Sequence, residues 1–143
     1  MSDLGYLPMS TMTENELASA IVDAALKIHK RLGPGLLESV YEVVLAYELR
    51  KRGIECERQV PVPILYDAIT FEEGFRIDLL VGGKVVVELK SIDDVTKVHR
   101  KILLTYLRLT DKRLGLLINF GAALLKDGIT RVVNGLPEDD GSS

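Results

Sequence analysis

The chain has 143 residues, nearly half of them apolar, which suggests one domain with one core and excludes disordered and fibrous proteins. Its formal net charge of −3 excludes attraction of nucleic acid by the whole surface, so any such contact must come from a local basic patch. No apolar run approaches the roughly 20 residues of a membrane span, and the N-terminus lacks the pattern of a signal peptide. Cys56 is the single cysteine, which excludes disulfide frameworks and cysteine-cluster zinc sites and makes a reducing cytoplasm the expected setting.

The first third of the chain carries the pattern of two helices. Thr13 and Glu16 form a capping box at the start of the first helix, and Gly33 is its expected C-terminal cap. The second helix is predicted over about residues 36–52, and residues 1–12 are expected to form a flexible tail. Apolar residues recur at helical spacing in both, at Leu17, Ile21, Ala24, Ala25, Ile28 and Leu32, and at Leu37, Val40, Tyr41, Val44, Leu45 and Leu49.

The middle of the chain is predicted to be mostly extended. A strand over residues 54–66 contains Pro61 and Pro63, which cannot donate ladder hydrogen bonds, so we expect this strand at a sheet edge. A turn or short loop is expected at 67–74, before a hairpin over residues 75–90.

The rest of the chain is predicted as a helix, two strands and a disordered acidic tail at 137–143. The helix spans about residues 95–109, and the strands lie at 114–120 and 129–133. The expected core face of the helix consists of Val95, Val98, Ile102, Leu103, Tyr106 and Leu109. This order predicts a single α/β domain over residues 13–136, with a mixed sheet flanked by helices.

Three ionisable residues, Asp78, Glu88 and Lys90, interrupt the otherwise apolar hairpin. Burying an unpaired charge is costly, so these groups need partners or a chemical task. Glu88 and Lys90 are two residues apart and therefore share one face of their strand. A two-residue turn of the glycines at 82–83 would put Asp78 on the opposite side, whereas a turn longer by one residue would set it opposite Glu88. The sequence leaves both registers open.

In the longer register, the three groups converge and describe a divalent-metal site beside a positive charge. Magnesium takes carboxylate oxygens and keeps several waters, and a metal-bound water is acidic enough to attack a phosphodiester. The competing interpretation is a structural ion pair between Asp78 and Lys90, with Glu88 capping a nearby group.

Two further features point toward the hairpin. Glu38 lies one turn into the second predicted helix, where it either reaches a metal held by the sheet or only stabilises the helix N-terminus. The segment 97–113 is clearly basic and indicates either phosphate contact or a solvated helix face. Its basic residues are Lys97, Arg100, Lys101, Arg108, Lys112 and Arg113, joined by His99. Tyr106 on the same helix is most simply a core aromatic.

Four motifs in order resemble the PD-(D/E)XK nuclease superfamily, and in particular its GxxExxY family. They are Gly35-x-x-Glu38-x-x-Tyr41, Asp78 with Glu88-Leu89-Lys90 ten residues later, and the stretches 115–121 and 128–134. The resemblance covers roughly residues 18–136. It implies a restriction-endonuclease-like core, a mixed sheet flanked by helices, with one magnesium site.

The resemblance also implies roles for individual residues. Carried over by position, Asp78 and Glu88 would be metal ligands, and the backbone carbonyl of Leu89 would complete the metal shell. Lys90 would stabilise or activate the attacking water. Glu38 would be the acidic residue of the first core helix, which completes the expected catalytic set.

The helix after this site matches the family pattern in part. His99 and Tyr106 match, whereas Ile102 stands where the family often has a glutamine that orients the lysine or a substrate phosphate. The residues expected to contact nucleic acid are Lys97, His99, Arg100, Lys101 and Tyr106.

The leading hypothesis is a magnesium-dependent nuclease that hydrolyses DNA, with manganese as an alternative metal. The alternative is a nuclease-fold protein that no longer cuts and serves as a nucleic-acid-binding or self-assembling scaffold. The acidic net charge and Ile102 favour this alternative. A homo-oligomer, formed through residues 61–66 or an apolar helix face, also stays open.

Overall fold

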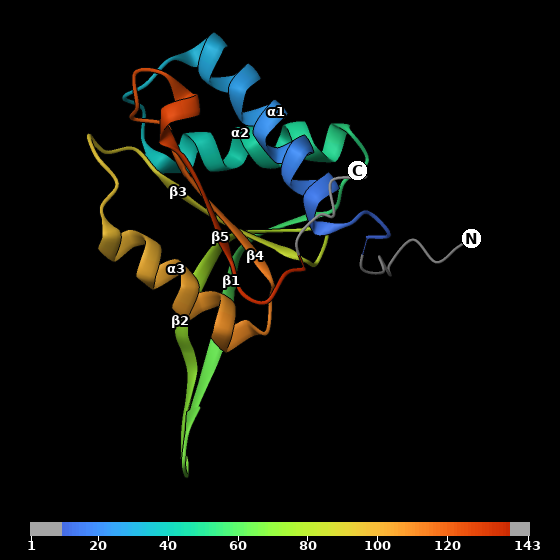
Figure 1. The fold of residues 1–143 in the computed structure, drawn as a ribbon, viewed down its shortest axis with the longest axis vertical. Helices are drawn as coiled ribbons and strands as arrows, with labels where there is room; N and C mark the ends of the chain where they lie inside the picture. Colours follow the sequence, from blue (N-terminus) through green and yellow to red (C-terminus); the bar gives the residue numbers. More distant parts are fainter. Residues whose placement is uncertain (1–9, 138–143) are drawn as a thin grey trace.

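The computed structural model describes residues 10–137, which form a five-stranded sheet with helices on both faces (Figure 1). The strand order is β1-β2-β3-β4-β5, and only β3 and β4 are parallel neighbours. This arrangement confirms the predicted α/β fold with a mixed sheet. The elements in chain order are α1 (Glu14–Leu32), α2 (Glu38–Lys51), β1 (Cys56–Tyr66), β2 (Ile69–Val81), β3 (Val85–Lys90), α3 (Lys97–Thr110), β4 (Leu114–Asn119), η1 (Leu125–Gly128) and β5 (Ile129–Val133).

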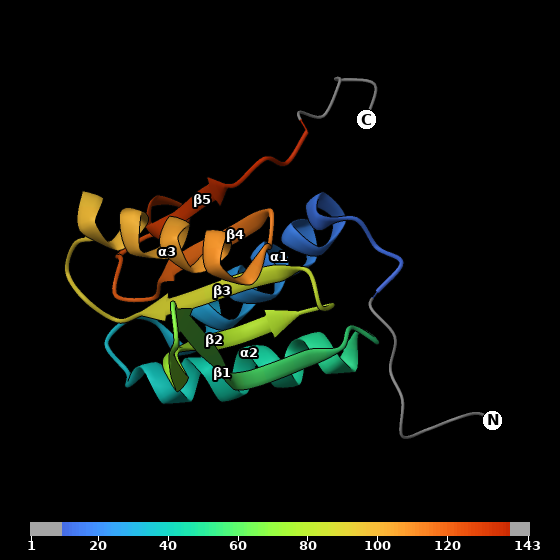
Figure 2. The same cartoon turned by 90° about the horizontal axis from the view of Figure 1, so that it is seen from below.

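The sheet separates two hydrophobic cores, with α1 and α2 on one face and α3 on the other (Figure 2). The larger core joins Ile21 of α1 and Leu45 of α2 to Val87 of β3. The smaller core joins Leu107 of α3 to Val86 of the same strand. Consecutive strand residues point to opposite faces, so the buried valine run of β3 belongs to both cores.

Tyr41 holds the connection between α1 and α2. Gly33 ends α1 with a φ of 76°. The fully buried Tyr41 ring stacks on Phe120 with centroids 4.2 Å apart. Its hydroxyl donates to the Gly33 carbonyl at 2.6 Å and accepts the Leu36 N–H at 3.1 Å. These bonds fix the segment that leads into Glu38, the first residue of α2.

The predicted core face of α3 is wrong in part. Leu103 and Leu107 are its buried residues, whereas Val98, Ile102 and Leu109 are exposed. The helix lies mainly against β4 and β5, with Tyr106 reaching Phe75 of β2, and its outward apolar residues stay uncovered. Helical spacing alone identifies an apolar helix but does not determine how much of its apolar surface is covered.

The loop predicted at 67–74 is also wrong, because β1 and β2 continue as one long hairpin that turns at Asp67-Ala68. Its distal part projects away from the rest of the domain (Figure 1). Four large apolar side chains are exposed there: Leu65, Tyr66, Ile69 and Phe71. We call this projection, residues 64–74, the arm. The expectation that the strand with Pro61 and Pro63 lies at an edge is confirmed, since β1 is the first strand of the sheet.

Within residues 10–137, no helix has both the length and the apolar character needed to cross a membrane. The predicted tails at 1–12 and 137–143 lie mostly outside the described residues. Of the described part, the Ser10 N–H donates to the Gly82 carbonyl at 3.1 Å, and Met12 packs against the larger core.

We predict that Tyr41→Phe lowers the free energy of unfolding by about 1–2 kcal/mol, because it removes a hydroxyl that bonds two backbone groups. Chemical denaturation monitored by circular dichroism measures this loss. The matched control is Tyr47→Phe, because Tyr47 is exposed on the same helix. Equal stability of the two variants would contradict the role given to the Tyr41 hydroxyl.

Candidate active site

The β2–β3 turn has the longer of the two registers that the sequence allows. Val81 pairs with Val85, so three residues form the turn. Both glycines in it have positive φ, 61° at Gly82 and 70° at Gly83, a conformation that glycine adopts without strain. This register puts Asp78 opposite Glu88.

Asp78 and Glu88 meet where β2 and β3 separate. The Asp78 N–H donates to Glu88 Oε1 at 3.4 Å, and the Leu89 N–H donates to Asp78 Oδ2 at 2.9 Å. The ladder between the two strands extends only from Leu79 toward the turn. The Asp78 carboxylate therefore takes a backbone donor at the point where the regular ladder ends.

Glu88 and Lys90 lie on the α3 side of the sheet. They line a small pocket of about 100 Å³ together with His99, Ile102 and Tyr106. His99 Nδ1 accepts the Thr96 N–H at 3.0 Å, so one ring nitrogen caps α3. The structure thus brings two expected catalytic residues, Glu88 and Lys90, next to His99 and Tyr106, which were expected to contact nucleic acid.

Tyr106 is more than a core aromatic. Its ring stacks on Phe75 with centroids 4.1 Å apart, which fixes it at the base of the arm. Burial raises the pKa of Tyr106, and the charges of Glu88 and Asp78 raise it further. The phenol therefore lies within electrostatic range of both carboxylates.

Glu38 lies at the solvent-exposed rim of this region, and one turn further along α2 is an acid that the sequence reasoning missed. Glu42 is buried and accepts hydrogen bonds from Arg58 Nε at 3.0 Å and Gln59 Nε2 at 2.6 Å. Residues four apart share a helix face, so the spacing from Glu38 was the available signal. Burial raises the pKa of Asp78, and the charge of Glu42 and, to a lesser degree, that of Glu38 raise it further.

The carboxylates of Asp78 and Glu88 repel each other in a partly dry environment. Burial raises the pKa of Asp78, while the Leu89 N–H lowers it. Burial and the charge of Asp78 raise the pKa of Glu88 to about 8, against a smaller lowering by Lys90. A proton or a cation between the two oxygens relieves this repulsion.

The donor set fits magnesium rather than a metal enclosed by protein ligands. Within residues 10–137, no group of three or more histidine, cysteine or acidic side chains is arranged to hold a metal. Magnesium is usually held by one or two carboxylates and keeps several waters, and Asp78 with Glu88 supply two. The role expected for the Leu89 carbonyl stays a prediction; the Leu89 N–H is the group that contacts Asp78.

The basic segment around α3 does not form one uniform surface. Lys97, Arg100 and Lys101 are exposed, and Arg100 lines a groove that also contains Asp93, Asp94 and Asp127. Two other bases are engaged in the fold: Lys112 Nζ donates to the Gly83 carbonyl at 2.9 Å, and Arg113 pairs with Glu14 at 3.1 Å. Lys97 and Lys101 are the two lysines of α3, one turn apart and both exposed.

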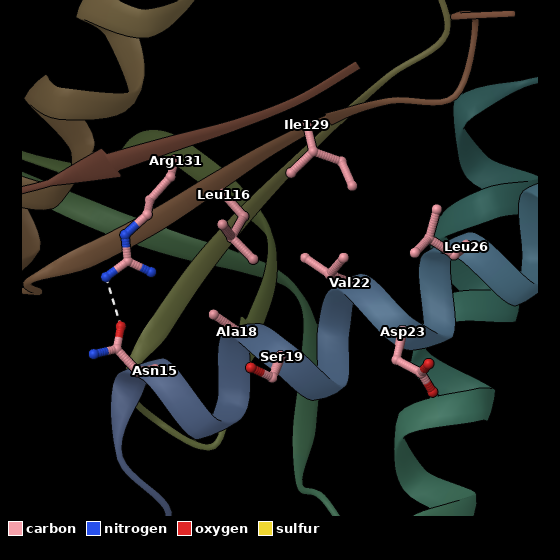
Figure 3. A pocket seen from close by; sticks show the side chains of 9 residues that line it. All are labelled: Asn15, Ala18, Ser19, Val22, Asp23, Leu26, Leu116, Ile129 and Arg131. Atoms are coloured by element: carbon pink, nitrogen blue, oxygen red, sulfur yellow. Dashed lines mark hydrogen bonds between the residues drawn. The ribbon is translucent and has the colours of Figure 1, made fainter. Parts of the chain in front are cut away.

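A wider groove of about 630 Å³ lies elsewhere, between α1 and β5 (Figure 3). Its walls are mostly apolar, and three of its polar side chains, Asn15, Asp23 and Arg131, are hydrogen-bonded or ion-paired. Arg131 donates to Asn15, as Figure 3 shows, and Asp23 pairs with Arg52 at 2.8 Å. Size alone does not make it the active site, because it lacks the convergent ionisable groups present at Glu88 and Lys90.

A family model described as the PD-(D/E)XK nuclease superfamily matches residues 15–132. The matched range contains all four expected catalytic residues and the whole sheet except Val133, the last residue of β5. The mixed sheet with helices on both faces is consistent with a restriction-endonuclease-like core. Comparison with curated proteins and with solved structures gives no match.

We predict that Glu88→Gln stabilises the metal-free protein at pH 8 by about 1–3 kcal/mol and has little effect near pH 5. Glu88 has a pKa of about 8 in the folded protein against an ordinary value of 4.5. The unfolded chain therefore loses this proton first, and the wild-type protein loses stability as the pH rises between these values.

Denaturation in the presence of a chelator at several pH values measures the difference between wild type and variant. The matched control is Glu72→Gln, because Glu72 is exposed on the arm. Parallel pH–stability curves for wild type and Glu88→Gln would show that Glu88 is not held in an environment that disfavours its charge.

Proposed function

Because the chain belongs to the PD-(D/E)XK nuclease superfamily, we propose that it hydrolyses phosphodiester bonds of DNA. In this proposal Asp78, Glu88 and Lys90 form the active site. The observation that carries this proposal is the meeting of the two carboxylates at the end of the β2–β3 ladder, with Lys90 in the pocket beside them. The Gly35-to-Tyr41 motif further supports membership of the GxxExxY family.

Asp78 and Glu88 would hold magnesium, or manganese in its place, with the Leu89 carbonyl as a further ligand. When bound, the metal supplies Lewis acidity at the scissile phosphate and lowers the pKa of a water ligand. The raised pKa of Glu88 supports this assignment, because burial and the charge of Asp78 both disfavour the Glu88 carboxylate and a shared cation would favour it.

Lys90 places a positive charge next to the carboxylate pair. Its charge lowers the pKa of Glu88, so the ammonium group is within electrostatic range of the site. A fixed positive group stabilises negative charge as it develops on the phosphate during attack. Glu38 and Glu42 keep the outer side of the site negative, which favours cation binding over binding of a free anion.

Lys97 and Lys101 would hold the phosphate backbone beside this site, with Arg100 and His99 at its margin. Phosphate contacts position a nucleic acid without reading its sequence. Tyr106, fixed against Phe75 and lining the Glu88 pocket, offers a ring face or hydroxyl to the substrate.

The second candidate function is a nucleic-acid-binding scaffold that does not cut. The observation that favours it is Ile102, which lines the same pocket as Glu88 and Lys90. An isoleucine gives no hydrogen bond, whereas the glutamine common in the family would orient Lys90 or a phosphate. The two candidates share a fold and a surface and differ only in turnover.

We predict that purified protein cuts DNA with magnesium or manganese, and that Lys90→Ala and Asp78→Asn each reduce the rate at least about 100-fold. Linear, circular and single-stranded DNA are incubated in parallel and analysed on gels. Asp78→Asn is expected to bind DNA as well as wild type or better, because it removes negative charge near the phosphate.

Binding without cleavage under either metal would refute the enzyme and support the scaffold. In that case Ile102→Gln tests the cause, and the exposure of Ile102 makes the substitution tolerable to the fold. Cleavage that survives in both Lys90→Ala and Asp78→Asn would place the chemistry elsewhere.

We predict that DNA binding weakens steeply with salt, with a log–log slope of about −0.9 for each phosphate contact on a duplex. Lys97→Glu combined with Lys101→Glu is expected to weaken binding on every sequence and to flatten the slope by about 0.9 per lost contact. The control combines Lys30→Glu with Arg31→Glu, which reverses the same number of exposed positive charges on α1. Fluorescence anisotropy at several salt concentrations measures both quantities, and an equal effect of the control would contradict an α3 interface.

A further inference from the structure

Helix α2 is apolar on the side that faces the sheet and also on the side that faces solvent. On the inner side, Tyr41, Leu45 and Leu49 are fully buried. On the outer side, Val43 is 48% exposed and Tyr47 is 58% exposed. A surface helix normally presents polar residues to solvent, so an apolar outer side indicates a missing packing partner.

The outer residues have the spacing of a helix–helix seam. Val40, Val43 and Tyr47 of α2 are exposed large apolar residues, separated by three and four positions. This is the a/d spacing by which two helices pack knobs into holes, over one repeat. We call these three residues the α2 seam. Leu36 and Leu37, which precede the helix, are 39% and 74% exposed.

A groove between α1 and α2 continues the seam. It has a volume of about 340 Å³, and Ile28, Leu32, Val44 and Tyr47 form its apolar walls. At its rim, the buried Glu48 carboxylate is neutralised by Lys27 at 3.1 Å and Lys51 at 3.9 Å. A groove with apolar walls and a neutralised acid suits an apolar side chain from another helix rather than a charged ligand.

We propose that the α2 seam packs against the α2 seam of a second copy of this chain, with the helices antiparallel about a two-fold axis. From their exposed fractions, the seam, Leu32, Leu36 and Leu37 together expose on the order of 500 Å² per copy. If a contact covered all of this surface, two copies would bury on the order of 1,000 Å², the lower limit for a specific interface. A two-fold contact sets the same apolar residues of the two copies against each other.

The antiparallel arrangement follows from the composition of the helix. A two-fold axis near Val43 brings the two Val43 side chains together and sets Val40 of each copy against Tyr47 of the other. Antiparallel helix dipoles attract, whereas parallel ones repel. Because the interface is near the lower size limit, the dimer is expected to be weak and reversible, with a dissociation constant in the micromolar range.

The arm is the strongest competing surface. It also exposes four apolar side chains, but Asp67 and Glu72 leave it acidic, while its third acid, Glu73, pairs with Arg76 at 2.6 Å. Two acidic arms repel each other, whereas the charge nearest the seam is the single Lys51 ammonium over the Tyr47 ring. An arm variant is the matched control for a seam variant.

Sedimentation velocity over a concentration series from about 1 to 500 μM tests the proposal. Wild type is expected to pass from monomer to dimer, and Val43→Glu and Tyr47→Glu are each expected to weaken dimerisation at least tenfold. Phe71→Glu on the arm is expected to leave it unchanged. A monomer at all concentrations, or loss of dimer only in Phe71→Glu, would overturn the proposal and leave the seam to a different partner.

Disulfide trapping tests the register and does not depend on the folding of charged variants. Val43→Cys is expected to form a covalent dimer on mild oxidation, whereas Leu124→Cys, exposed on another surface, is not. The native Cys56 is buried and its pKa is raised to about 11, so it does not compete. Equal trapping of the two variants would show random collision instead of a specific seam.

The proposal stands apart from the nuclease function. Val43 and Tyr47 face away from the sheet, while Lys90 lies on the α3 side of it. Val43→Glu is therefore expected to retain the DNA affinity and cleavage rate of wild type per chain. Val43→Glu is expected to lose the dimer and keep cleavage, whereas Lys90→Ala is expected to lose cleavage and keep the dimer. The two measurements therefore show separately whether the dimer proposal or the nuclease proposal fails.

Discussion

The pair of half-buried carboxylates, Asp78 and Glu88, is the constraint on which the site depends. They face each other only because the β2–β3 turn has three residues, and they meet where the regular ladder stops. The Leu89 N–H satisfies one Asp78 oxygen, but the remaining charge is relieved by no cationic side chain bonded to either carboxylate among the described residues. Tyr41 fixes the start of α2, and through it the acids that add to this negative field. The fold thus concentrates negative charge where two strands separate.

Much of the fold could be predicted from local sequence patterns. The capping box at Thr13, the end of α1 at Gly33 and the edge position of the proline-containing strand are each set by one or two residues. The arm could not be predicted in the same way. Glu72, Glu73 and Gly74 disfavour a strand, and they lie at a register shift where they have no ladder partners. Phe71 and Phe75 on either side pair with Ile64 and Val62, which keeps the hairpin continuous. The face of α3 was also mispredicted, because the extent of burial depends on where a helix sits on the sheet.

The candidate site was likewise predicted in part. Alternation placed Glu88 and Lys90 together, and the two glycines allowed the register that brings Asp78 to them. Glu42 was missed because its burial depends on Arg58 and Gln59 of β1, a contact that no local pattern states. In the proposed account, α3 borders the chemistry and the outer side of α2 serves assembly, while Glu38 and Glu42 at the start of α2 act on Asp78 by their charge.

Direct metal binding tests the central claim most sharply. Manganese is paramagnetic, so electron paramagnetic resonance counts the ions bound per chain without any need for turnover. Wild type is expected to bind one Mn²⁺, more tightly as the pH rises toward 8, because the cation replaces the proton that Glu88 retains. Magnesium is expected to compete, and Asp78→Asn and Glu88→Gln are each expected to abolish binding. Undiminished Mn²⁺ binding in both variants, or none in wild type, would contradict a metal site at this carboxylate pair.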